Sequence, residues 1–388
     1  MTKVMIGLSG GVDSAVAAYL LKKQGYDVVA GFMRNWDAIA NGDFLGNPTL
    51  NNDCCPQEAD YEDAKKVAAK LGIELFRIDF IKEYWDEVFT YFLKEYENGR
   101  TPNPDIFCNK YIKFDAFLKF AKSKGCDYIA TGHYAKRVDK DGKTFLYKSY
   151  DQNKDQTYFL SQLNQEQIAS CLFPLGDIDK TEVRKIAHEL ELNVADKKDS
   201  TGVCFIGERN FKEFLKNYIP AKKGDIVDVN TLEVVGHHDG VLYYTIGQRR
   251  GLGIGGISGR VANSWFVVKK DVKKNILYVA SGNEDEHLLS DRTIVKNCVF
   301  NNVFPKENMH VGCKFRYRQK DQDIEIERLD DTSVLVKYPQ TIASVTEGQE
   351  AVFYDGDKCI GGGVIEEVFK DGKNLNQLIM ETANGYRG

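Results

Sequence analysis

The chain has 388 residues, of which 43% are hydrophobic and 28% are charged, and its formal net charge is −5. This length predicts two or three domains, no apolar run approaches the ~20 residues of a membrane span, and the N-terminus lacks a signal-peptide pattern. We expect a cytoplasmic globular protein without membrane contact, and the acidic balance gives no sign of nonspecific nucleic-acid binding, although a local basic face is compatible with it.

The first 25 residues combine a strand, a glycine turn and a helix start. Residues 3–8 form a short apolar run typical of a strand, and the apolar side chains of residues 16–21 share one helical face. In the SGGVDS sequence between them, Gly10 and Gly11 let the backbone approach an anion closely, and Ser9 and Ser14 offer hydroxyl donors. Because the N-terminus of a helix also presents unpaired N–H groups, this stretch predicts a phosphate-binding loop.

Strands and helices continue to alternate as far as residue 131. The apolar patterns predict strands over residues 26–33, 74–78 and 127–131, and helices over residues 56–72, 82–97 and 112–125. This alternation predicts an α/β fold with a doubly wound, mostly parallel sheet, whose ligands lie at the carboxyl ends of the strands. The prolines of residues 99–109 predict a break in regular structure, since proline fits neither a helix interior nor a central strand.

The second half of the chain has a different pattern of predicted secondary structure. A Lys-Asp-Gly-Lys turn predicts a hairpin over residues 134–148, and helices are expected at about residues 180–191 and 210–218. Beyond Pro220, short alternating strands continue with no convincing amphipathic helix, which predicts a small β-rich domain and then a β-barrel or sandwich. The predicted domains are 1–218 (catalytic), 219–285 (small, β-rich) and 286–388 (C-terminal β-barrel).

The first loop differs from two common nucleotide-binding motifs. It lacks the lysine of a Walker A loop and the last glycine of a dinucleotide fingerprint. Its strand-SGGVDS-helix context instead resembles the PP-loop of the N-type ATP pyrophosphatases. That resemblance implies cleavage of ATP between the α- and β-phosphates and adenylation of an acceptor. A glycine-rich turn of purely structural use is the weaker alternative.

The nine cysteines include two in predicted loops, Cys108 and Cys204. An odd, scattered set does not form a disulfide framework. Nearby N–H groups could stabilise a thiolate at either loop cysteine, but two partly buried structural thiols are an equal alternative. Cys54-Cys55 is a rival pair. The remaining five are expected to be packing residues: Cys126, Cys171, Cys298, Cys313 and Cys359. Because the chain has no Cys-x-x-Cys pair, we expect no structural zinc site.

Two basic segments leave their role open. Residues 251–256 formally match G-x-G-x-x-G, but no helix follows, so the dinucleotide interpretation fails. With Gln248, Arg249, Arg250 and Arg260 around it, the segment is either a flexible basic loop near RNA or a plain β connection. Arg316 to Gln319, predicted in a strand, could offer cations and a stacking ring to a nucleic acid, or could simply be a solvated strand face.

Taken together, eight motifs in order along nearly the whole chain resemble those of the bacterial-type tRNA-specific 2-thiouridylases. They are SGGVDS at 9–14, GFMRNW at 31–36, NPDIFCN at 103–109, ATGHYA at 130–135, KDQTYFL at 154–160, DSTGVCFIGER at 199–209, IGQRRGLGIGG at 246–256 and FRYRQ at 315–319. Other PP-loop enzymes share the first motif but lack the two cysteine motifs.

The resemblance implies that the enzyme makes 2-thiouridine at the wobble position of tRNAs for lysine, glutamate and glutamine. It implies ATP and Mg²⁺ as cofactors, the tRNA anticodon stem-loop as a partner, and a persulfide donor protein, either a cysteine desulfurase or a sulfur-relay protein. The implied ATP-binding residues are Gly7, Leu8, Ser9, Gly10, Gly11, Val12, Asp13, Ser14, Ala15, Met33 and Gly132. Asn103, Pro104 and Asp105 would meet the target base, and tRNA would contact His133, Lys154, Asp155, Gln156, Arg316, Tyr317 and Gln349.

By the same resemblance, Cys204 carries the persulfide and Cys108 releases the sulfur, closing a disulfide. Adenylation suits this chemistry, because it turns the uracil C2 oxygen into a good leaving group for an ionised sulfur nucleophile. Asp105 is the candidate for proton transfer, with an N-cap-like turn residue as its alternative. Two other functions stay open: a PP-loop ligase or amidotransferase acting on a metabolite, and a noncatalytic RNA-binding protein.

Overall fold

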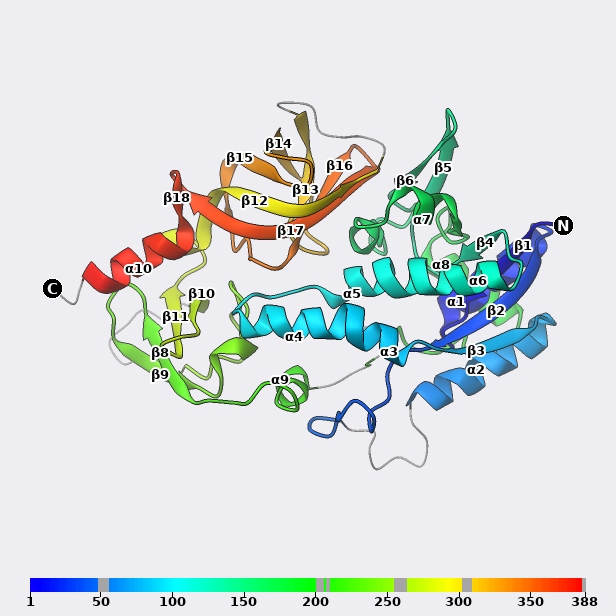
Figure 1. The fold of residues 1–388 in the computed structure, drawn as a ribbon, viewed down its shortest axis with the longest axis horizontal. Coiled ribbons are helices and arrows are strands. Elements are labelled where there is room, and N and C mark those ends of the chain that lie inside the picture. Colours follow the sequence, from blue (N-terminus) through cyan, green and yellow to red (C-terminus); the bar gives the residue numbers. More distant parts are fainter. Residues whose placement is uncertain (48–55, 200–205, 207–209, 255–263, 302–308, 386–388) are drawn as a thin grey trace.

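The computed structural model describes residues 1–47, 56–199, 206, 210–254, 264–301 and 309–385 (Figure 1). Cys54, Cys55 and Cys204 lie outside the described residues, as does the end of the glycine-rich segment at 251–256. Within the described part of the chain, no helix combines the length and apolar character needed to cross a membrane.

The N-terminal part is the predicted doubly wound sheet. Five parallel strands follow the order β3-β2-β1-β4-β7. Alternate residues of β1 face opposite layers: Val4 and Ile6 join the core that includes α1, α2 and α8, whereas Met5 joins the core under the helices of residues 81–123. The strands are β1 Lys3–Gly7, β2 Asp27–Arg34, β3 Leu75–Asp79, β4 Tyr128–Ala130 and β7 Cys171–Leu172. The helices of the first layer are α1 Val12–Lys23, α2 Pro56–Leu71 and α8 Lys180–Glu189.

Two long helices cover the second face of the sheet (Figure 1). The first runs through α3 Ile81–Tyr84, a π-helical turn at Trp85–Phe89 and α4 Thr90–Glu97. The second runs through α5 Pro104–Phe107, a π-helical stretch at Cys108–Ala116 and α6 Phe117–Ser123. The predicted break through residue 109 is therefore wrong, because Pro104 takes the first helical position, where its missing N–H costs nothing, and Asn103 caps the helix.

Shorter elements connect the sheet to the second half of the chain. The predicted hairpin is confirmed, and its second strand pairs with the last long strand of the C-terminal sheet through Tyr147 and Lys358. The elements are β5 Lys136–Lys140, β6 Lys143–Tyr147, a 3-10 turn at Thr157–Leu160, α7 Gln165–Ala169 and α9 Phe211–Leu215. The N-terminal part is thus tied into the C-terminal sheet by backbone pairing.

The central part forms a four-stranded sheet in the order β10-β11-β8-β9. Its strands are β8 Gly224–Asp228, β9 Val234–His238, β10 Trp265–Asp271 and β11 Ile276–Ser281, with a 3-10 turn at Val241–Tyr243.

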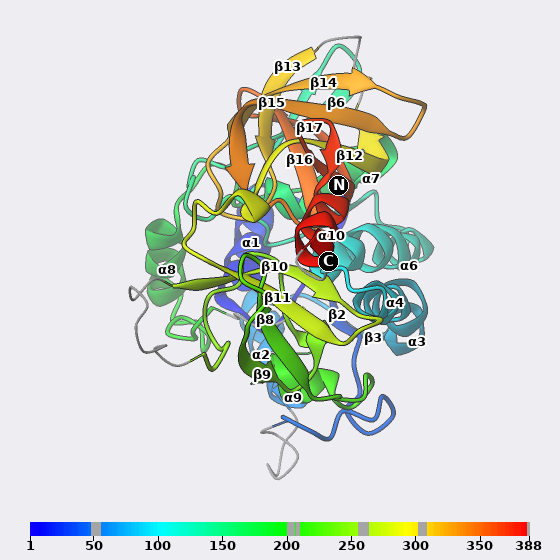
Figure 2. The same ribbon diagram turned by 90° about the vertical axis from the view of Figure 1, so that its left-hand side faces the viewer.

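The C-terminal part is a six-stranded antiparallel barrel, closed because β12 pairs with both β15 and β17. The predicted absence of a helix there is wrong: α10 Leu375–Gly385 lies between the barrel and the four-stranded sheet (Figures 1 and 2). Leu375, Ile379 and Ala383 recur every four residues and are buried on its packed face. The other elements are a 3-10 turn at Glu286–Leu288, β12 Leu289–Phe300, β13 Met309–Lys314, β14 Gln322–Arg328, β15 Val334–Ala343, β16 Glu350–Asp355, β17 Lys358–Lys370 and β18 Lys373–Asn374.

Candidate functional site

The loop between β1 and α1 has the geometry of an anion cradle. Gly10 has a φ of +75°, and a Cβ there would collide with the backbone oxygen of Asp60, so only glycine fits. The Ser14 hydroxyl accepts from Ser9 N at 3.1 Å and lies 3.1 Å from the Ser9 hydroxyl. Gly11 precedes α1 without a capping side chain, which leaves the positive end of the helix dipole facing the loop.

Other predicted ATP-binding residues pack around this loop. A Cβ on Gly132 would lie 2.8 Å from Ser14 N, and one on Gly7 would lie 3.1 Å from Met33 Cε, so these backbones approach the site closely. The structure therefore gathers the predicted set at one sheet edge. Three members of the set have buried apolar side chains and can offer a nucleotide only their backbone: Leu8, Val12 and Ala15.

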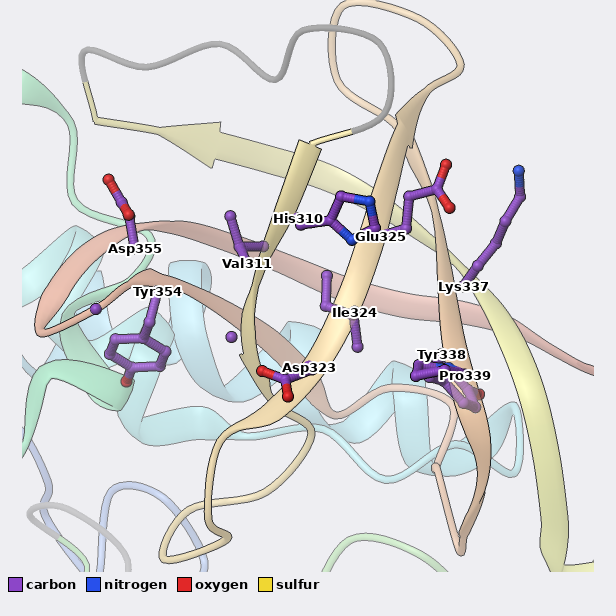
Figure 3. Close-up of a pocket in the computed structure, with 12 residues that line it drawn as sticks. His310, Val311, Asp323, Ile324, Glu325, Lys337, Tyr338, Pro339, Tyr354 and Asp355 are labelled. Atoms are coloured by element: carbon purple, nitrogen blue, oxygen red, sulfur yellow. The ribbon is translucent and has the colours of Figure 1, made fainter.

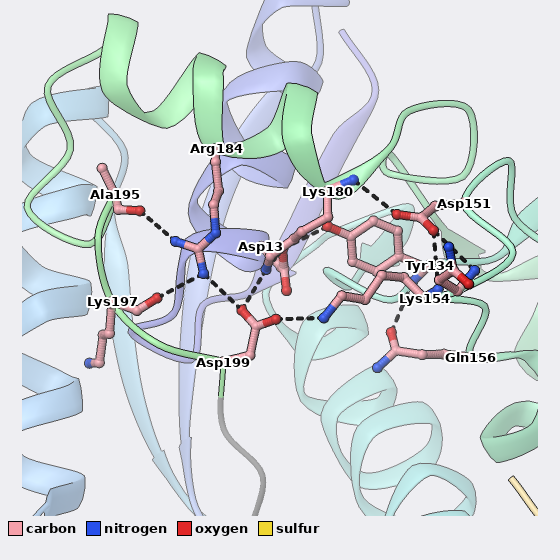
Figure 4. A network of polar contacts seen from close by, with 11 residues as sticks. Asp13, Tyr134, Asp151, Lys154, Gln156, Lys180, Arg184, Ala195, Lys197 and Asp199 are labelled. Atoms are coloured by element: carbon pink, nitrogen blue, oxygen red, sulfur yellow. Dashed lines mark hydrogen bonds and ion pairs between the residues drawn. The ribbon is translucent and has the colours of Figure 1, made fainter. Parts of the chain in front are cut away.

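An ion-pair network joins the loop to the chain that precedes Cys204 (Figure 4). Asp13 accepts from the Tyr134 hydroxyl at 2.8 Å and from Lys180 Nζ at 2.7 Å. Lys180 also lies 2.7 Å from Asp199, which pairs in addition with Lys154 at 2.6 Å and with Arg184 at 3.3 Å. Although partial burial opposes it, the hydrogen bonds from Lys154 and Lys180 lower the pKa of Asp199 to about 2. Asp199 is thus a carboxylate held by three cations.

A second cation, Lys197, also touches the loop itself. Lys197 Nζ donates to Gly10 O at 2.9 Å and to carboxylates of Asp60 and Asp63, each at 2.7 Å. Lys180 and Lys197 thus contact the loop itself, whereas Lys154 and Arg184 are linked to it through Asp199, and all four cations are paired with carboxylates. Of these four, only Lys154 lies in one of the sequence motifs with an expected role, because no local pattern links the others to the first loop.

The predicted base-binding segment starts the second long helix. The Asn103 side chain accepts from Asp105 N at 3.2 Å, so Asn103 is the cap of this helix and Asp105 lies in its first turn. Cys108 begins the π-helical stretch and is fully buried, rather than lying in a loop as the sequence predicted. Any reaction at this thiol therefore requires the cover over the helix to move.

All three parts of the chain meet just before this helix. Gln349 of the barrel donates to Thr101 O at 2.7 Å, and Thr101 N donates to Glu347 O at 3.0 Å. From the central sheet, Lys270 Nζ donates to Tyr244 O at 2.9 Å and to the Thr101 hydroxyl at 3.3 Å. This junction fixes the direction in which the chain enters the segment that begins at Asn103.

The residues predicted to contact tRNA differ in exposure and in their contacts. His133 Nδ1 lies 2.8 Å from the Thr131 hydroxyl, and burial together with nearby Lys113 lowers its pKa well below the usual range, so its ring is neutral. Gln156 accepts from Tyr134 N at 3.0 Å. Asp155 is buried and holds its own turn, accepting from Ser149 N at 3.1 Å.

The FRYRQ motif lies in the turn after β13, so its predicted place in a strand is wrong. Arg316 donates to Ile246 O at 2.8 Å and Ser344 O at 2.7 Å, which ties the barrel to the central part of the chain. The half-buried Tyr317 ring packs against Phe159, with 4.4 Å between the ring centroids. The five cysteines expected to be packing residues are all buried: Cys126, Cys171, Cys298, Cys313 and Cys359.

A buried carboxyl of the barrel, that of Glu350, is linked through Gln162 to the helix that contains Cys108. Glu350 is fully buried, and its Oε2 accepts from Gln162 Nε2 at 3.2 Å, while its Oε1 has no hydrogen-bond partner in the described structure. Gln162 in turn accepts from Lys110, two residues beyond Cys108, at 3.2 Å. Desolvation raises the pKa of Glu350 to about 7.

We expect Glu350→Gln to become increasingly stabilising as the pH rises from 5 to 8. Above its ordinary pKa of 4.5 this carboxyl releases its proton in the unfolded state, whereas in the folded state it keeps the proton up to about pH 7. The free energy of unfolding of the parent protein therefore falls by about 3 kcal/mol as the pH rises from 5 to 8. Unfolding midpoints measured at pH 5 and pH 8 test this, with exposed Glu381→Gln as the control. A midpoint difference that stays constant with pH would contradict the assigned protonation.

A separate pocket opens on the barrel. It has a volume of about 460 Å³ and is lined by residues of β13 to β16 and the turn after β16, including His310, Glu325 and Lys337 (Figure 3). None of the predicted site residues lines it.

Comparison with known proteins covers nearly the whole chain. Three family models match it: a "tRNA methyl transferase HUP domain" at residues 2–208, a "tRNA methyl transferase PRC-barrel domain" at 212–281 and an "Aminomethyltransferase beta-barrel domain" at 290–365. The chain is 55% identical to the tRNA-specific 2-thiouridylase MnmA of Mycoplasmopsis synoviae, over 97% of this chain and 98% of that one. It is 51% identical to that of Mycoplasmopsis pulmonis, over 98% and 100%, and 54% identical to that of Mycoplasma capricolum, over 95% and 99%.

Proposed function

The chain belongs to the tRNA-specific 2-thiouridylase family and is a tRNA-uridine 2-sulfurtransferase, and on that premise we propose how and where it acts. The proposed product is 2-thiouridine at the wobble position of tRNAs for lysine, glutamate and glutamine. The uracil C2 oxygen is adenylated by ATP, and a cysteine persulfide then supplies the sulfur. The observation that carries this proposal is the Asp13–Lys180–Asp199 bridge, which links the nucleotide loop to the chain five residues before Cys204.

The first half-reaction transfers AMP to the C2 oxygen and releases pyrophosphate. The Gly10–Gly11 turn and the start of α1 would hold the phosphates, with the Ser9 and Ser14 hydroxyls as further donors. Lys180 and Lys197 can exchange a carboxylate for the departing pyrophosphate, since a phosphate accepts the same hydrogen bonds.

Magnesium fits this site as a partner of the nucleotide. In the described part of the chain no group of three or more His, Cys, Asp or Glu side chains could hold a metal by itself. Mg²⁺ is commonly held by one or two carboxylates plus substrate phosphates and waters, and Asp13 is the carboxylate nearest the cradle. When bound, the ion would neutralise charge on the phosphates.

The target base would lie against the start of the Cys108 helix. Asn103 Oδ1 already accepts from Asp105 N, and its amide nitrogen could donate to a carbonyl oxygen of the uracil. Pro104 would offer an apolar face and Asp105 a carboxylate for proton transfer. The wobble base lies in a single-stranded loop, so it can be turned into this site at limited cost in stacking.

The second half-reaction balances without an external oxidant. The terminal sulfur of a Cys204 persulfide attacks C2 and AMP leaves, which gives a C2–S–S–Cys204 adduct. The Cys108 thiolate then attacks Cys204 Sγ, the S–S bond to the base breaks, and its electron pair stays on the 2-thiouridine sulfur. The product is a Cys108–Cys204 disulfide, which a cellular dithiol reduces.

The residues predicted to contact tRNA would serve its binding in two ways. His133, Lys154, Gln156 and Tyr317 are only partly buried and can meet the anticodon stem-loop directly. Asp155, Arg316 and Gln349 hold turns in internal hydrogen bonds, so they would act by shaping the surface that tRNA contacts. The proposed setting is the cytoplasm, with a persulfide-carrying protein as sulfur donor.

One assay tests the function. With ATP, MgCl₂, sodium sulfide and unmodified tRNA, hydrosulfide can take the place of the persulfide, since it attacks the adenylated C2 directly and displaces AMP without an oxidant. We then expect tRNA-dependent release of one pyrophosphate per 2-thiouridine, detected by mass spectrometry of digested tRNA. A tRNA with cytidine at the wobble position should support neither reaction. AMP formation that ignores tRNA would favour a metabolite ligase, and tRNA binding without pyrophosphate release would favour a noncatalytic RNA-binding protein.

A further inference from the structure

We propose that three apolar side chains in the loop after β2, Ile39, Phe44 and Leu45, form the docking surface for the persulfide-carrying protein that delivers sulfur. This inference rests on the proposed function, because only that function requires such a donor. We call these three residues the apolar tip.

The apolar tip is unusually exposed. Ile39 is 78% exposed, Phe44 53% and Leu45 49%. Other large apolar side chains exposed in the described chain, such as Val234 and Leu329, lie far from these three in sequence, whereas the tip gathers its three within seven residues. Apolar groups gathered at the surface in this way mark sites of interaction with another molecule.

The loop is held in place although its apolar side chains face solvent. The Asn217 side chain, just beyond α9, accepts from Phe44 N at 3.2 Å and Leu45 N at 2.8 Å, and it donates to Leu45 O at 3.1 Å. The Tyr218 hydroxyl donates to Asn41 O at 2.9 Å. In Figure 1 the loop lies beside α9. The tip is therefore presented on an ordered support, which lowers the entropy lost when a partner binds.

Charge indicates which class of partner fits. From Asn35 to Ala64 the chain contains no Lys or Arg and has Asp37, Asp43, Asp53, Glu58, Asp60, Glu62 and Asp63. Five of these carboxylates are paired with cations, Asp37 with Arg34, Glu58 with Arg77, Glu62 with Lys65, and Asp60 and Asp63 with Lys197, so much of this charge is compensated. The segment still offers no Lys or Arg of its own to a phosphate backbone, whose binding depends on those residues. Aliphatic Ile39 and Leu45 are also poor stacking platforms for bases. An apolar surface without cations of its own therefore fits a protein with an apolar patch better than it fits RNA.

The position of the tip suits delivery to Cys204. A Cβ on Gly46, next to Leu45, would lie 3.2 Å from Asn210 O, so the loop touches Asn210. Asn210 follows Cys204 by six residues, and six residues span at most about 20 Å. A protein bound at the tip can therefore reach the proposed sulfur acceptor with its own loop.

The transfer itself is a simple exchange. The Cys204 thiolate attacks the outer sulfur of the donor persulfide, the donor S–S bond breaks, and the donor cysteine leaves as a thiolate. The number of persulfides is unchanged, so the step needs no oxidant or reductant.

The test compares two sulfur sources with one triple variant, Ile39→Ser, Phe44→Ser and Leu45→Ser. With a bacterial cysteine desulfurase and L-cysteine as the source, we expect thiolation to fall at least about tenfold. With sodium sulfide, which needs no docking, thiolation should stay within about twofold of the parent. The matched control, Val234→Ser with Leu329→Ser, removes two equally exposed apolar side chains and should lower neither rate.

Each contrary result has one meaning. Unchanged desulfurase-driven thiolation in the triple variant, or equal loss with both sulfur sources, would overturn the docking surface. A parent protein that thiolates tRNA with neither source would instead overturn the proposed function. A photo-cross-linker at position 44 gives a second readout: capture of the desulfurase supports the surface, and capture of tRNA refutes it.

Discussion

Cys204→Ala is expected to abolish thiolation driven by a cysteine desulfurase, with a loss of at least about a thousandfold, because the variant has no sulfur on which to build the persulfide. Release of pyrophosphate from ATP in the presence of tRNA should persist, since the adenylating loop is intact. Mass spectrometry of digested tRNA and a pyrophosphate assay measure the two half-reactions separately. Full thiolation in this variant would remove Cys204 from the mechanism.

Two comparisons sharpen this result. Cys54→Ala with Cys55→Ala removes the rival pair and should leave desulfurase-driven thiolation unchanged. Cys108→Ser keeps Cys204 but removes the thiol that completes the disulfide, so the C2–S–S–Cys204 adduct should accumulate. A tRNA–protein conjugate on a non-reducing gel, released by dithiothreitol, would identify that adduct. Turnover by Cys108→Ser at the parent rate would show that another thiol resolves it.

The parts of the fold that follow from local pattern were predictable. The strands of the parallel sheet are short apolar runs, and Gly10 and Gly11 mark the turn to α1 directly. Two helices were missed for local reasons as well. Pro104 resembles a helix breaker in sequence, although proline is favoured at the first helical position. The four-residue spacing of Leu375, Ile379 and Ala383 is a short helical signal within a chain segment otherwise rich in strands.

The contacts that assemble the site could not be predicted from the sequence, because they join residues that lie far apart in the chain. Lys180 is 167 residues from Asp13, and Lys197 is 187 residues from Gly10, so neither pair leaves a local signal. The burial of Arg316 against Ile246 and Ser344 likewise depends on how the barrel packs on the central part. A charged residue in a turn looks the same in sequence whether it faces solvent or joins two domains.

The ion-pair bridge has a chemical consequence for the first half-reaction. Lys180 is the one residue that contacts both Asp13 in the cradle and Asp199 before the Cys204 segment, at 2.7 Å in each case, among the pairs described. Its side chain is 13% exposed, so solvent screens these pairs only partly. Without the Lys180 ammonium, the negative charges of Asp13 and Asp199 would be less neutralised and would repel an incoming polyphosphate. The link between the two segments would also be lost.

Lys180→Met is therefore expected to lower the rate of tRNA-dependent pyrophosphate release by about a hundredfold, a loss typical of removing one charged group that stabilises a transition state. Lys180→Arg, which keeps the charge, should recover part of the rate. Lys185→Met is the matched control, because Lys185 lies on the same helix, is exposed and pairs with Glu182 at 3.5 Å, away from the cradle. If Lys180→Met and Lys185→Met release pyrophosphate equally fast, the bridge holds the fold and has no part in adenylation.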